Sequence, residues 1–368
     1  MGDELAYIQQ AVTAHKLAGD GSFTERVSAL LERALGAPRV LLTTSCTHAL
    51  ELSALLLDVQ AGDEVVLPSF TFVSTANAFV LRGARPVFAD IRPDTLNLDE
   101  RQLERHLGPR TRVLVPVHYA GVACELDAIG ALARARGLAV VEDNAHGLFG
   151  TYKGRPLGSF GALATQSFHE TKNFSCGEGG ALVINDPALI ERAEIIREKG
   201  TNRRRFLRGE IDKYSWVDVG SSYLPSEILA AVLLAQLEKR QQIQARRQAI
   251  WDRYQERLGP VAERFGLTVP TVPAGCEQTH HLYWLLARTP AQRNALLAHL
   301  KSHGIAATFH YVPLHLSEMG KKLGAKPGDC PVAESVADRL LRLPLHLELS
   351  EPDQDRVVAA LVSGLSAG

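Results

Sequence analysis

The sequence has none of the features that mark membrane, secreted or nucleic-acid-binding proteins. Its longest apolar stretch, ILAAVLLAQL at 228–237, is well short of the roughly 20 residues that a membrane-spanning helix needs. The N-terminal stretch MGDELAYIQQAVTAHK carries charges where a signal peptide has an apolar core. Basic and acidic residues nearly balance, to a formal net charge of -1, and neither sign forms a block. We therefore expect neither a membrane nor nucleic acid as a partner.

Metal-site and nicotinamide-binding motifs are also missing. The five cysteines form no CxxC pair, so neither a disulfide framework nor a zinc site is predicted; they are Cys46, Cys124, Cys176, Cys276 and Cys330. Such cysteines favour a reducing compartment, and we expect a cytoplasmic protein without a metal. No GxGxxG follows the first predicted strand, which argues against a nicotinamide-dependent dehydrogenase.

Alternating apolar runs and helical stretches begin at about residue 39. Strands are predicted at 39–44, 63–69, 84–90, 111–118 and 138–144, and helices at 46–58, 73–83 and 125–137 between them. Two further buried strands flank residues 169–178. This alternation predicts the α/β class, with a mainly parallel sheet that is covered by helices on both faces.

The length of 368 residues allows about two domains. A long amphipathic helix is predicted from 225 to 258, without an internal glycine or proline. It would link a large domain, residues 1–258, to a smaller C-terminal α+β domain, residues 259–368. In the smaller domain we expect strands at 281–287 and 305–311 and a helix at 291–304.

Three connections at predicted strand ends carry polar residues that suit one cofactor. The first connection, TTSCTHAL at 43–50, has a helix N-terminus and hydroxyl groups after a strand. The second, VVEDNAH at 140–146, has acidic residues at the end of a strand. The third, SFHETKNFSCGEGG at 167–180, contains Lys172. Taken singly, these are ordinary as an N-cap, a helix cap and a surface lysine. Together, an anion cup, a carboxylate and an amine are what the phosphate, ring nitrogen and aldehyde of pyridoxal phosphate (PLP) require.

The same stretches resemble a known enzyme family. PSFTFVSTANAF, VEDNAHGLFGTYKGRPLGSFG and SFHETKN…GEGGAL are similar to the DegT/StrS-type sugar aminotransferases, which depend on PLP and have fold type I, the aspartate aminotransferase-like fold. The resemblance covers nearly the whole chain. IREKGTNRRRFLRGEIDKYSWVDVGSSYLPSE, FHYVPLH and RLLRLPLH are similar to the subgroup that aminates C4 of dTDP-4-keto-6-deoxyglucose.

The resemblance implies roles for the residues around the cofactor ring. Lys172 matches the lysine that bonds the cofactor aldehyde and carries the proton, and we expect burial to lower its pKa. Asp143 matches the carboxylate that pairs with the ring nitrogen. His146 falls where the family has Gln or His beside the ring hydroxyl, and Phe72 matches the aromatic residue that stacks on the ring.

The resemblance also implies a phosphate site with two departures from the family pattern. Ser167 matches a phosphate-binding hydroxyl, and Cys46 and Thr47 match the Gly-Thr whose amides hold the phosphate. Cysteine in place of glycine requires a turn without positive φ. GSSYLPSE at 220–227 lacks the asparagine that some members offer to the neighbouring subunit's phosphate, and Ser221 or Ser222 is our hypothesis for a substitute.

The resemblance further implies substrates and partners. We expect an amino acid, L-glutamate by family habit, to give its amino group to a nucleotide-linked ketosugar, with pyridoxamine phosphate formed in between. Arg203, Arg204, Arg205 or Arg208 would bind the sugar diphosphate. Tyr311 and His315 are candidates for the sugar pocket, with purely structural roles as the alternative. A homodimer with the active site at the subunit interface is expected from the resemblance.

Several alternatives stay open at the level of sequence. The ketosugar could be UDP-linked or aminated at C3, and the stereochemistry at the aminated carbon and the pathway are undetermined. Related sugar 3-dehydratases have histidine in place of the lysine, so Lys172 argues against that activity. A non-catalytic, regulatory PLP- or sugar-binding protein would be expected to lose Lys172 or Asp143, and both are present.

Overall fold

The computed structural model describes residues 2–367, and a seven-stranded sheet forms the centre of the larger part. Its strand order is β1-β9-β8-β5-β4-β2-β3. The strands are β1 (Arg39–Thr43), β2 (Glu64–Pro68), β3 (Arg85–Ala89), β4 (Thr111–Leu114), β5 (Ala139–Asp143), β8 (Leu163–Ser167) and β9 (Gly180–Ile184). Only β9 runs antiparallel to its neighbours. The predicted strands and the mainly parallel sheet are confirmed.

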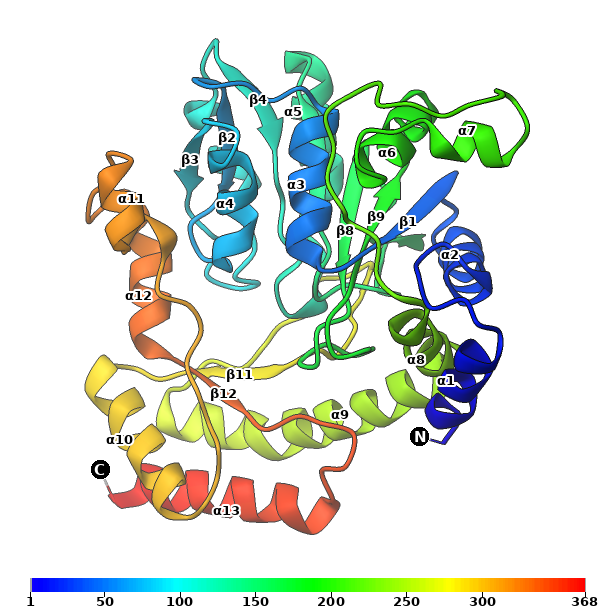
Figure 1. Ribbon diagram of the computed structural model, residues 1–368. Helices are drawn as coiled ribbons and strands as arrows, with labels where there is room; N and C mark the ends of the chain where they lie inside the picture. Colours follow the sequence, from blue (N-terminus) through cyan, green and yellow to red (C-terminus); the bar gives the residue numbers. More distant parts are fainter. Residues whose placement is uncertain (1, 368) are drawn as a thin grey trace.

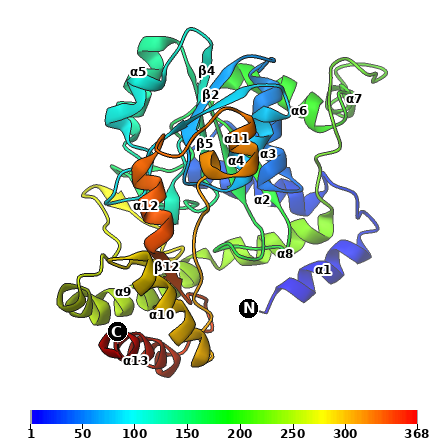
Figure 2. The same cartoon turned by 90° about the vertical axis from the view of Figure 1, so that its left-hand side faces the viewer.

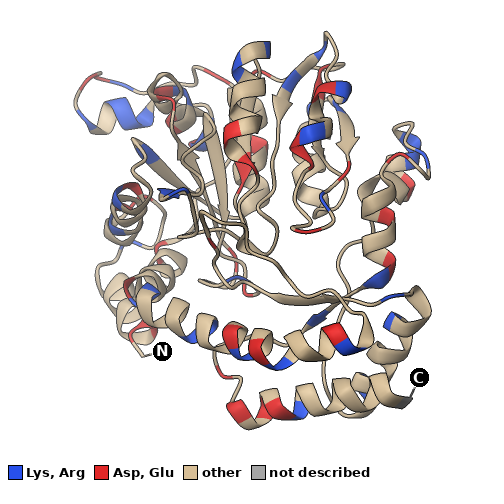
Figure 3. Cartoon of the chain, turned by 180° about the vertical axis from the view of Figure 1, so that it is seen from behind, with Lys and Arg blue, Asp and Glu red and all other residues tan. Residues whose placement is uncertain are grey.

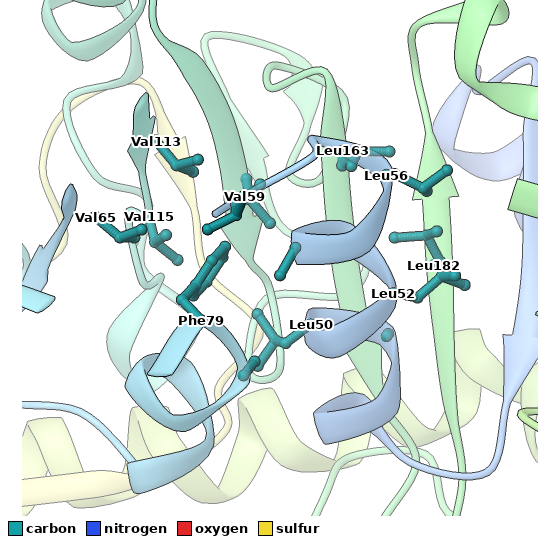
Figure 4. Packing of buried hydrophobic residues seen from close by; sticks show 14 of the residues in the cluster. Leu50, Leu52, Leu56, Val59, Val65, Phe79, Val113, Val115, Leu163 and Leu182 are labelled. Carbon is teal, nitrogen blue, oxygen red and sulfur yellow. The ribbon is translucent and has the colours of Figure 1, made fainter. Parts of the chain in front are cut away.

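Helices cover both faces of this sheet (Figure 1). One face carries α3 (Cys46–Leu56), α4 (Val73–Val80) and α6 (Ile190–Arg197), and the other carries α2 (Ser22–Leu35), α5 (Leu126–Arg136) and α8 (Glu227–Glu238). Strand alternation divides the side chains between the faces: Leu41 packs with α3, whereas Val40 packs with α2. Figure 4 shows Leu52 of α3 next to Leu182 of β9 in the first of these cores.

The smaller part contains a two-stranded antiparallel sheet, β11 (Tyr283–Leu286) with β12 (Leu340–Leu343). It packs with α9 (Arg240–Phe265), α10 (Pro290–Ser302) and α13 (Glu351–Ala367), while α12 (Pro331–Arg339) leads into β12. Figures 1 and 2 show this part stacked against the large sheet. The predicted strand at 305–311 is wrong, because only Thr308 forms a bridge there, to Arg342.

The predicted single helix over 225–258 is two helices. The chain turns at Lys239, between α8 and α9, and α9 then continues through Gly259 and Pro260 to Phe265. Residue 258, which we predicted as the end of the large domain, therefore lies inside a helix. Proline lacks only one amide donor, and the surrounding apolar contacts of Leu258 and Ala262 hold the helix together across it.

Short elements complete the structure. The helices are α1 (Glu4–Thr13), α7 (Arg203–Leu207) and α11 (Glu318–Lys322), and the 3-10 turns are η1 (Glu100–His106), η2 (Tyr119–Gly121), η3 (Pro187–Leu189) and η4 (Leu314–Leu316). The strands β6 (Thr151–Tyr152), β7 (Arg155–Pro156) and β10 (Cys276–Glu277) form a small separate sheet. Among the described residues, no helix has the length and apolar character needed to cross a membrane.

Glu142, the neighbour of Asp143 in β5, is a buried carboxylate that binds the backbone of a nearby loop. It accepts hydrogen bonds from the backbone amides of Gly158, Phe160 and Gly161 at 2.6–2.9 Å, and from His118 Nε2 at 3.0 Å. Burial would raise the pKa of Glu142, but these hydrogen bonds and the His118 ring hold it below its ordinary value. The carboxylate thus fixes the 158–161 loop against β5.

We predict that Glu142→Gln lowers the free energy of unfolding by about 2–4 kcal/mol, because the amide group turns a donor toward backbone donors. Urea unfolding followed by circular dichroism measures this change. Glu104→Gln is the control, since Glu104 is exposed and pairs with Arg136 at the surface. Equal unfolding midpoints for the two variants would show that Glu142 does not anchor the loop.

Candidate active site

The connections that follow strands β1, β2, β5 and β8 open into one cavity of about 670 Å³. The small domain supplies the other wall, from residues 281–282, 306–311 and 342–345. Carboxyl ends of parallel strands meet at one edge of a sheet, so four separate sequence segments converge there. The predicted site residues that line this cavity are Cys46, Thr47, Phe72, Asp143, His146, Ser167, Lys172 and Tyr311.

The N-terminus of α3 forms an anion cup at one end of the cavity. Ser45 caps the helix, its Oγ accepting a hydrogen bond from the His48 amide at 3.1 Å, and the next amides have no acceptor within the helix. Cys46 begins α3 without a positive φ, as its replacement of glycine requires. A side chain at Gly180 would overlap the Ser45–Cys46 backbone, so glycine lets β9 pack directly behind the cup.

Asp143 ends β5 with both carboxylate oxygens held in place. Oδ2 accepts a hydrogen bond from Thr75 Oγ1 at 2.8 Å, and Oδ1 accepts one from the Ala145 amide at 3.2 Å. Thr71 contacts Thr75 in turn, at 2.9 Å between hydroxyl oxygens. The carboxylate is almost fully buried yet faces the cavity, where it can accept a further bond from a cationic ligand atom.

Lys172 projects into the cavity from the β8–β9 connection. A turn with its amide bonded to the His169 carbonyl at 2.9 Å fixes its backbone. Within residues 2–367 its amine has neither a hydrogen bond nor an ion pair, which is unusual for a lysine away from open solvent. Burial lowers the pKa of Lys172, as we expected, and the Arg342 charge adds to that effect while Asp143 opposes it. A larger fraction of the amine is therefore uncharged and nucleophilic at neutral pH.

His146 lies beside this lysine as a neutral ring. It stacks on His281 with centroids 4.2 Å apart, and His281 Nδ1 is 2.8 Å from Asn173 Oδ1. Burial, with the Lys172 charge, lowers the pKa of His146 well below its usual value. Its Nδ1 is buried without a hydrogen-bond partner among the described residues, so it is available to a ligand.

Several aromatic side chains form one wall of the cavity. Phe72, at the start of α4, is 58% exposed and approaches Tyr311 with ring centroids 6.5 Å apart. Tyr311 stacks on His310 at 4.0 Å, and the Tyr119 hydroxyl lies 3.1 Å from His310 Nδ1. Burial lowers the pKa of His310 to about 2 and raises that of Tyr311, so this wall is uncharged.

Two predicted substrate residues lie elsewhere. His315 is fully buried outside the cavity lining, with Nδ1 2.5 Å from Ser69 Oγ and Nε2 2.9 Å from Glu334 Oε1. Arg203 belongs to α7, at the periphery in Figures 1 and 3, and pairs with Glu198 at 3.4 Å. Ser221 and Ser222 do not line the cavity either.

Sequence reasoning also missed residues that the cavity contains. Thr75 was one hydroxyl among several in PSFTFVSTANAF, and only the contact with Asp143 singles it out. His281 and Arg342 come from distant parts of the small domain. RLLRLPLH drew attention as a motif, but no spacing rule predicts that Arg342 lines the same cavity as Lys172.

The residues of the cavity fit PLP. The amides and hydroxyls at α3, together with Ser167, suit a phosphate, and Asp143 suits a protonated ring nitrogen. The unpaired Lys172 amine suits an aldehyde, and the free Nδ1 of His146 suits a ring hydroxyl. The donor set therefore covers each polar group of this cofactor.

Comparisons with known proteins agree with this fit. The model of the DegT/DnrJ/EryC1/StrS aminotransferase family matches residues 1–362. The chain is 36% identical over 335 residues to the Bacillus subtilis (strain 168) spore coat polysaccharide biosynthesis protein SpsC, across 89% of this chain and 85% of SpsC. The aminotransferase TlmJ from Streptoalloteichus hindustanus superposes with a TM-score of 0.91 at 35% identity, covering 100% of this chain and 97% of TlmJ.

The PLP form of Spr1654 from Streptococcus pneumoniae also superposes, with a TM-score of 0.91 at 26% identity, over 100% of this chain and 97% of Spr1654. The predicted fold, that of PLP-dependent fold type I aminotransferases, is thereby confirmed. The chain belongs to the DegT/DnrJ/EryC1/StrS aminotransferase family.

Proposed function

We propose that this protein is a PLP-dependent sugar aminotransferase that moves the amino group of L-glutamate to C4 of dTDP-4-keto-6-deoxyglucose. The observation that carries the proposal is the unpaired, half-buried Lys172 amine, in one cavity with Asp143 and the N-terminus of α3. The polysaccharide role in the name of SpsC supports a sugar as acceptor. The choice of C4 and of the dTDP nucleotide rests on the likeness of FHYVPLH and RLLRLPLH to the 4-amino subgroup.

Different residues of the cavity would bind the phosphate, the ring nitrogen and the ring hydroxyl of the cofactor. The amides of Cys46 and Thr47 and the hydroxyl of Ser167, which line the cavity, would hold the phosphate, and Phe72 would stack on the ring. Asp143 would hold the protonated ring nitrogen, and the hydrogen bond from Thr75 fixes the orientation of the carboxylate. His146, whose Nδ1 has no partner among the described residues and whose lowered pKa keeps the ring neutral, would bind the ring hydroxyl.

When bound, PLP supplies an aldehyde that takes up the amino group and a ring that withdraws electrons from the bond being broken. Lys172 would hold the aldehyde carbon through its amine, and the same amine would carry the proton to and from the substrate carbon. Its lowered pKa suits both tasks, because the amine must be free of its extra proton to begin. The uncharged wall of Tyr311 and His310 would face the sugar ring and keep water from it.

We also propose that the enzyme works as a cytoplasmic homodimer. Trp216 is 77% exposed, and Tyr214, Val217 and Val219 beside it are also exposed, which is more apolar surface than a free loop usually shows. The patch adjoins α7, whose basic residues do not line the cavity of their own chain. In the dimer, Arg203 of α7 would bind the sugar diphosphate at the second copy's cavity.

A visible absorbance spectrum tests the proposed function. We expect the protein with PLP to show a visible band that L-glutamate bleaches and dTDP-4-keto-6-deoxyglucose restores. Bleaching without restoration keeps the aminotransferase and removes this sugar, in favour of a UDP-linked or 3-keto acceptor. If no visible band forms, Lys172 does not bind the cofactor and a non-catalytic binding protein becomes the better account.

We predict that Phe72→Ala weakens PLP affinity by roughly 2- to 13-fold, because aromatic stacking is worth about 0.5–1.5 kcal/mol beyond buried area. Equilibrium dialysis of the cofactor measures the change. Leu81→Ala, near the other end of α4 and 64% exposed, is the control. Unchanged PLP affinity in the Phe72 variant would refute the stacking role.

A further inference from the structure

Asn173, the residue after Lys172, connects three polar groups behind the cavity. Its Nδ2 donates to the Thr279 carbonyl at 2.8 Å and to Gln244 Oε1 at 3.3 Å, and its Oδ1 lies 2.8 Å from His281 Nδ1. Asn173 is buried and does not line the cavity. Its side chain is therefore held by contacts within the chain.

These contacts determine which nitrogen of the His281 ring carries the proton. A backbone carbonyl only accepts hydrogen bonds, so the NH2 group of Asn173 faces Thr279 and its oxygen faces His281. That oxygen accepts from His281 Nδ1, which must then carry a proton. Burial, with the Lys172 charge, lowers the pKa of His281 well below its ordinary value, so the ring is neutral and Nε2 carries no proton. His281 is thus held in one tautomer and one orientation.

Two partners of Asn173 contact His146. The His281 ring stacks on the His146 ring, with centroids 4.2 Å apart and 29° between the planes. Thr279, which is fully buried, donates from Oγ1 to the His146 carbonyl at 2.6 Å. One contact holds the ring and the other holds the backbone. Asn173 therefore reaches His146 by two routes.

The segment 279–281, which leads into β11, is itself held from both sides. Arg247 of α9 donates to the carbonyls of His280, at 3.1 Å, and of His281. The Thr279 amide donates to the Gly121 carbonyl of η2 at 3.3 Å, and a side chain at Gly121 would overlap Thr279 Oγ1. The contacts around Asn173 therefore form one fixed network.

His146 depends on this network for its orientation. Its Nδ1 is buried without a partner among the described residues, so no hydrogen bond from that nitrogen holds the ring. Without the His281 ring behind it, the His146 ring could tilt, and the rate of an enzymatic reaction depends steeply on the placement of the groups around the reacting atoms.

We propose that Asn173 is a positioning residue that acts through Thr279 and His281 to hold His146 Nδ1 at the hydroxyl of the PLP ring. Because Asn173 follows Lys172, one short segment then places both the amine and the partner of the ring hydroxyl. The identity of the ligand rests on the proposed function, so the first test uses the cofactor-free protein.

Nitrogen NMR of the cofactor-free protein with ¹⁵N-labelled histidine tests the network. The wild type should show a neutral ring with its proton on Nδ1, assigned to His281 by its absence in His281→Phe. Asn173→Leu keeps the size of the side chain but removes its polar atoms, so this ring should no longer occupy one tautomer and the His146 signals should shift. A His281 proton on Nε2 in the wild type, or unchanged His146 signals in Asn173→Leu, would overturn the proposal.

A double-mutant cycle tests the functional role. Absorbance of the PLP-loaded protein follows the rate of its reaction with saturating L-glutamate. Asn173→Leu should lower this rate roughly 3- to 30-fold, but it should have no effect in the His146→Phe background, where no Nδ1 remains to be placed. Thr279→Val, which loses only a hydroxyl, should show the same pattern with a smaller effect. Asn294→Leu, on an exposed position of α10, is the control.

Losses of rate that multiply in the double variant would show that Asn173 acts independently of His146, as a residue that only stabilises the fold would, and would overturn the proposal. If circular dichroism shows that Asn173→Leu does not fold, the cycle of Thr279→Val with His146→Phe decides in the same way. If the wild type binds PLP but does not react with L-glutamate, the proposed donor fails, and the NMR comparison still decides on Asn173.

Discussion

Lys172→Ala is expected to lower kcat for sugar amination by at least about 1000-fold. Covalent catalysis and proton transfer by one positioned group contribute factors of this order or more, and among the described residues no other lysine lines the cavity to replace it. The cofactor should still bind through its phosphate and ring contacts, but its visible band should shift to that of free PLP. Product formation is measured by chromatography of the sugar nucleotide.

Lys301→Ala provides the matched control for this variant. Lys301 is an exposed residue near the end of α10 that does not line the cavity, and its loss should leave kcat unchanged. Normal turnover by Lys172→Ala would show that Lys172 takes no part in catalysis and would contradict the proposed active site.

Asp143→Asn is expected to keep the cofactor and lose at least about 100-fold of turnover. The asparagine oxygen can still accept from the Ala145 amide, and its NH2 group can donate to the Thr75 hydroxyl, whose own proton can turn to Thr71, so the fold around β5 should persist. It no longer offers a negative charge to the ring nitrogen. A hydrogen bond between charged groups is worth about 1.5–3 kcal/mol, which corresponds to a roughly 10- to 150-fold loss of rate. Weaker electron withdrawal by the ring would add to this loss. Steady-state kinetics with saturating PLP isolates this effect from cofactor binding.

The matched control for Asp143→Asn is Asp338→Asn. Asp338 is exposed on α12 and does not line the cavity. Full activity of Asp143→Asn would show that another group serves the ring nitrogen, whereas loss of PLP binding together with loss of structure would place Asp143 among the residues that stabilise the fold.

The strands and connections of the large domain were predictable because each follows a local rule. Short apolar runs bounded by turn residues become buried strands, and the polar residues that end them meet at one edge of the sheet. Asp143 and Lys172 could therefore be assigned to one site from sequence, although they come from different connections. The Ser45 cap and the helix start at Cys46 follow from equally local hydrogen bonding.

The small domain shows where local rules fail. Residues 305–311 are as apolar as a strand, but β11 pairs with 340–343, a choice made by tertiary packing. Gly259 and Pro260 predict a helix end that the core contacts of α9 override. The motif FHYVPLH suggests His315 as a site residue, yet its two ring nitrogens are within hydrogen-bond distance of Ser69 and Glu334. Only the folded structure shows these contacts.

Arg342 illustrates the same limit for function. In RLLRLPLH it is one arginine of two, and Arg339 donates to the Ala287 carbonyl at 3.2 Å while Arg342 faces Lys172 without a partner. The two arginines are three residues apart, but Arg339 is the last residue of α12 and Arg342 lies in β12. Their side chains therefore have different surroundings. Sequence pattern alone does not locate that transition to the residue.

Transfer of labelled nitrogen tests the central claim most directly. The PLP-loaded protein is incubated with ¹⁵N-labelled L-glutamate and dTDP-4-keto-6-deoxyglucose, and the sugar nucleotide is isolated and examined by mass spectrometry and NMR. The account predicts a dTDP-4-amino-4,6-dideoxyhexose with ¹⁵N bonded to C4, formed by the wild type and not by Lys172→Ala. Recovery of the ketosugar without ¹⁵N from a correctly folded, PLP-loaded wild type would contradict it.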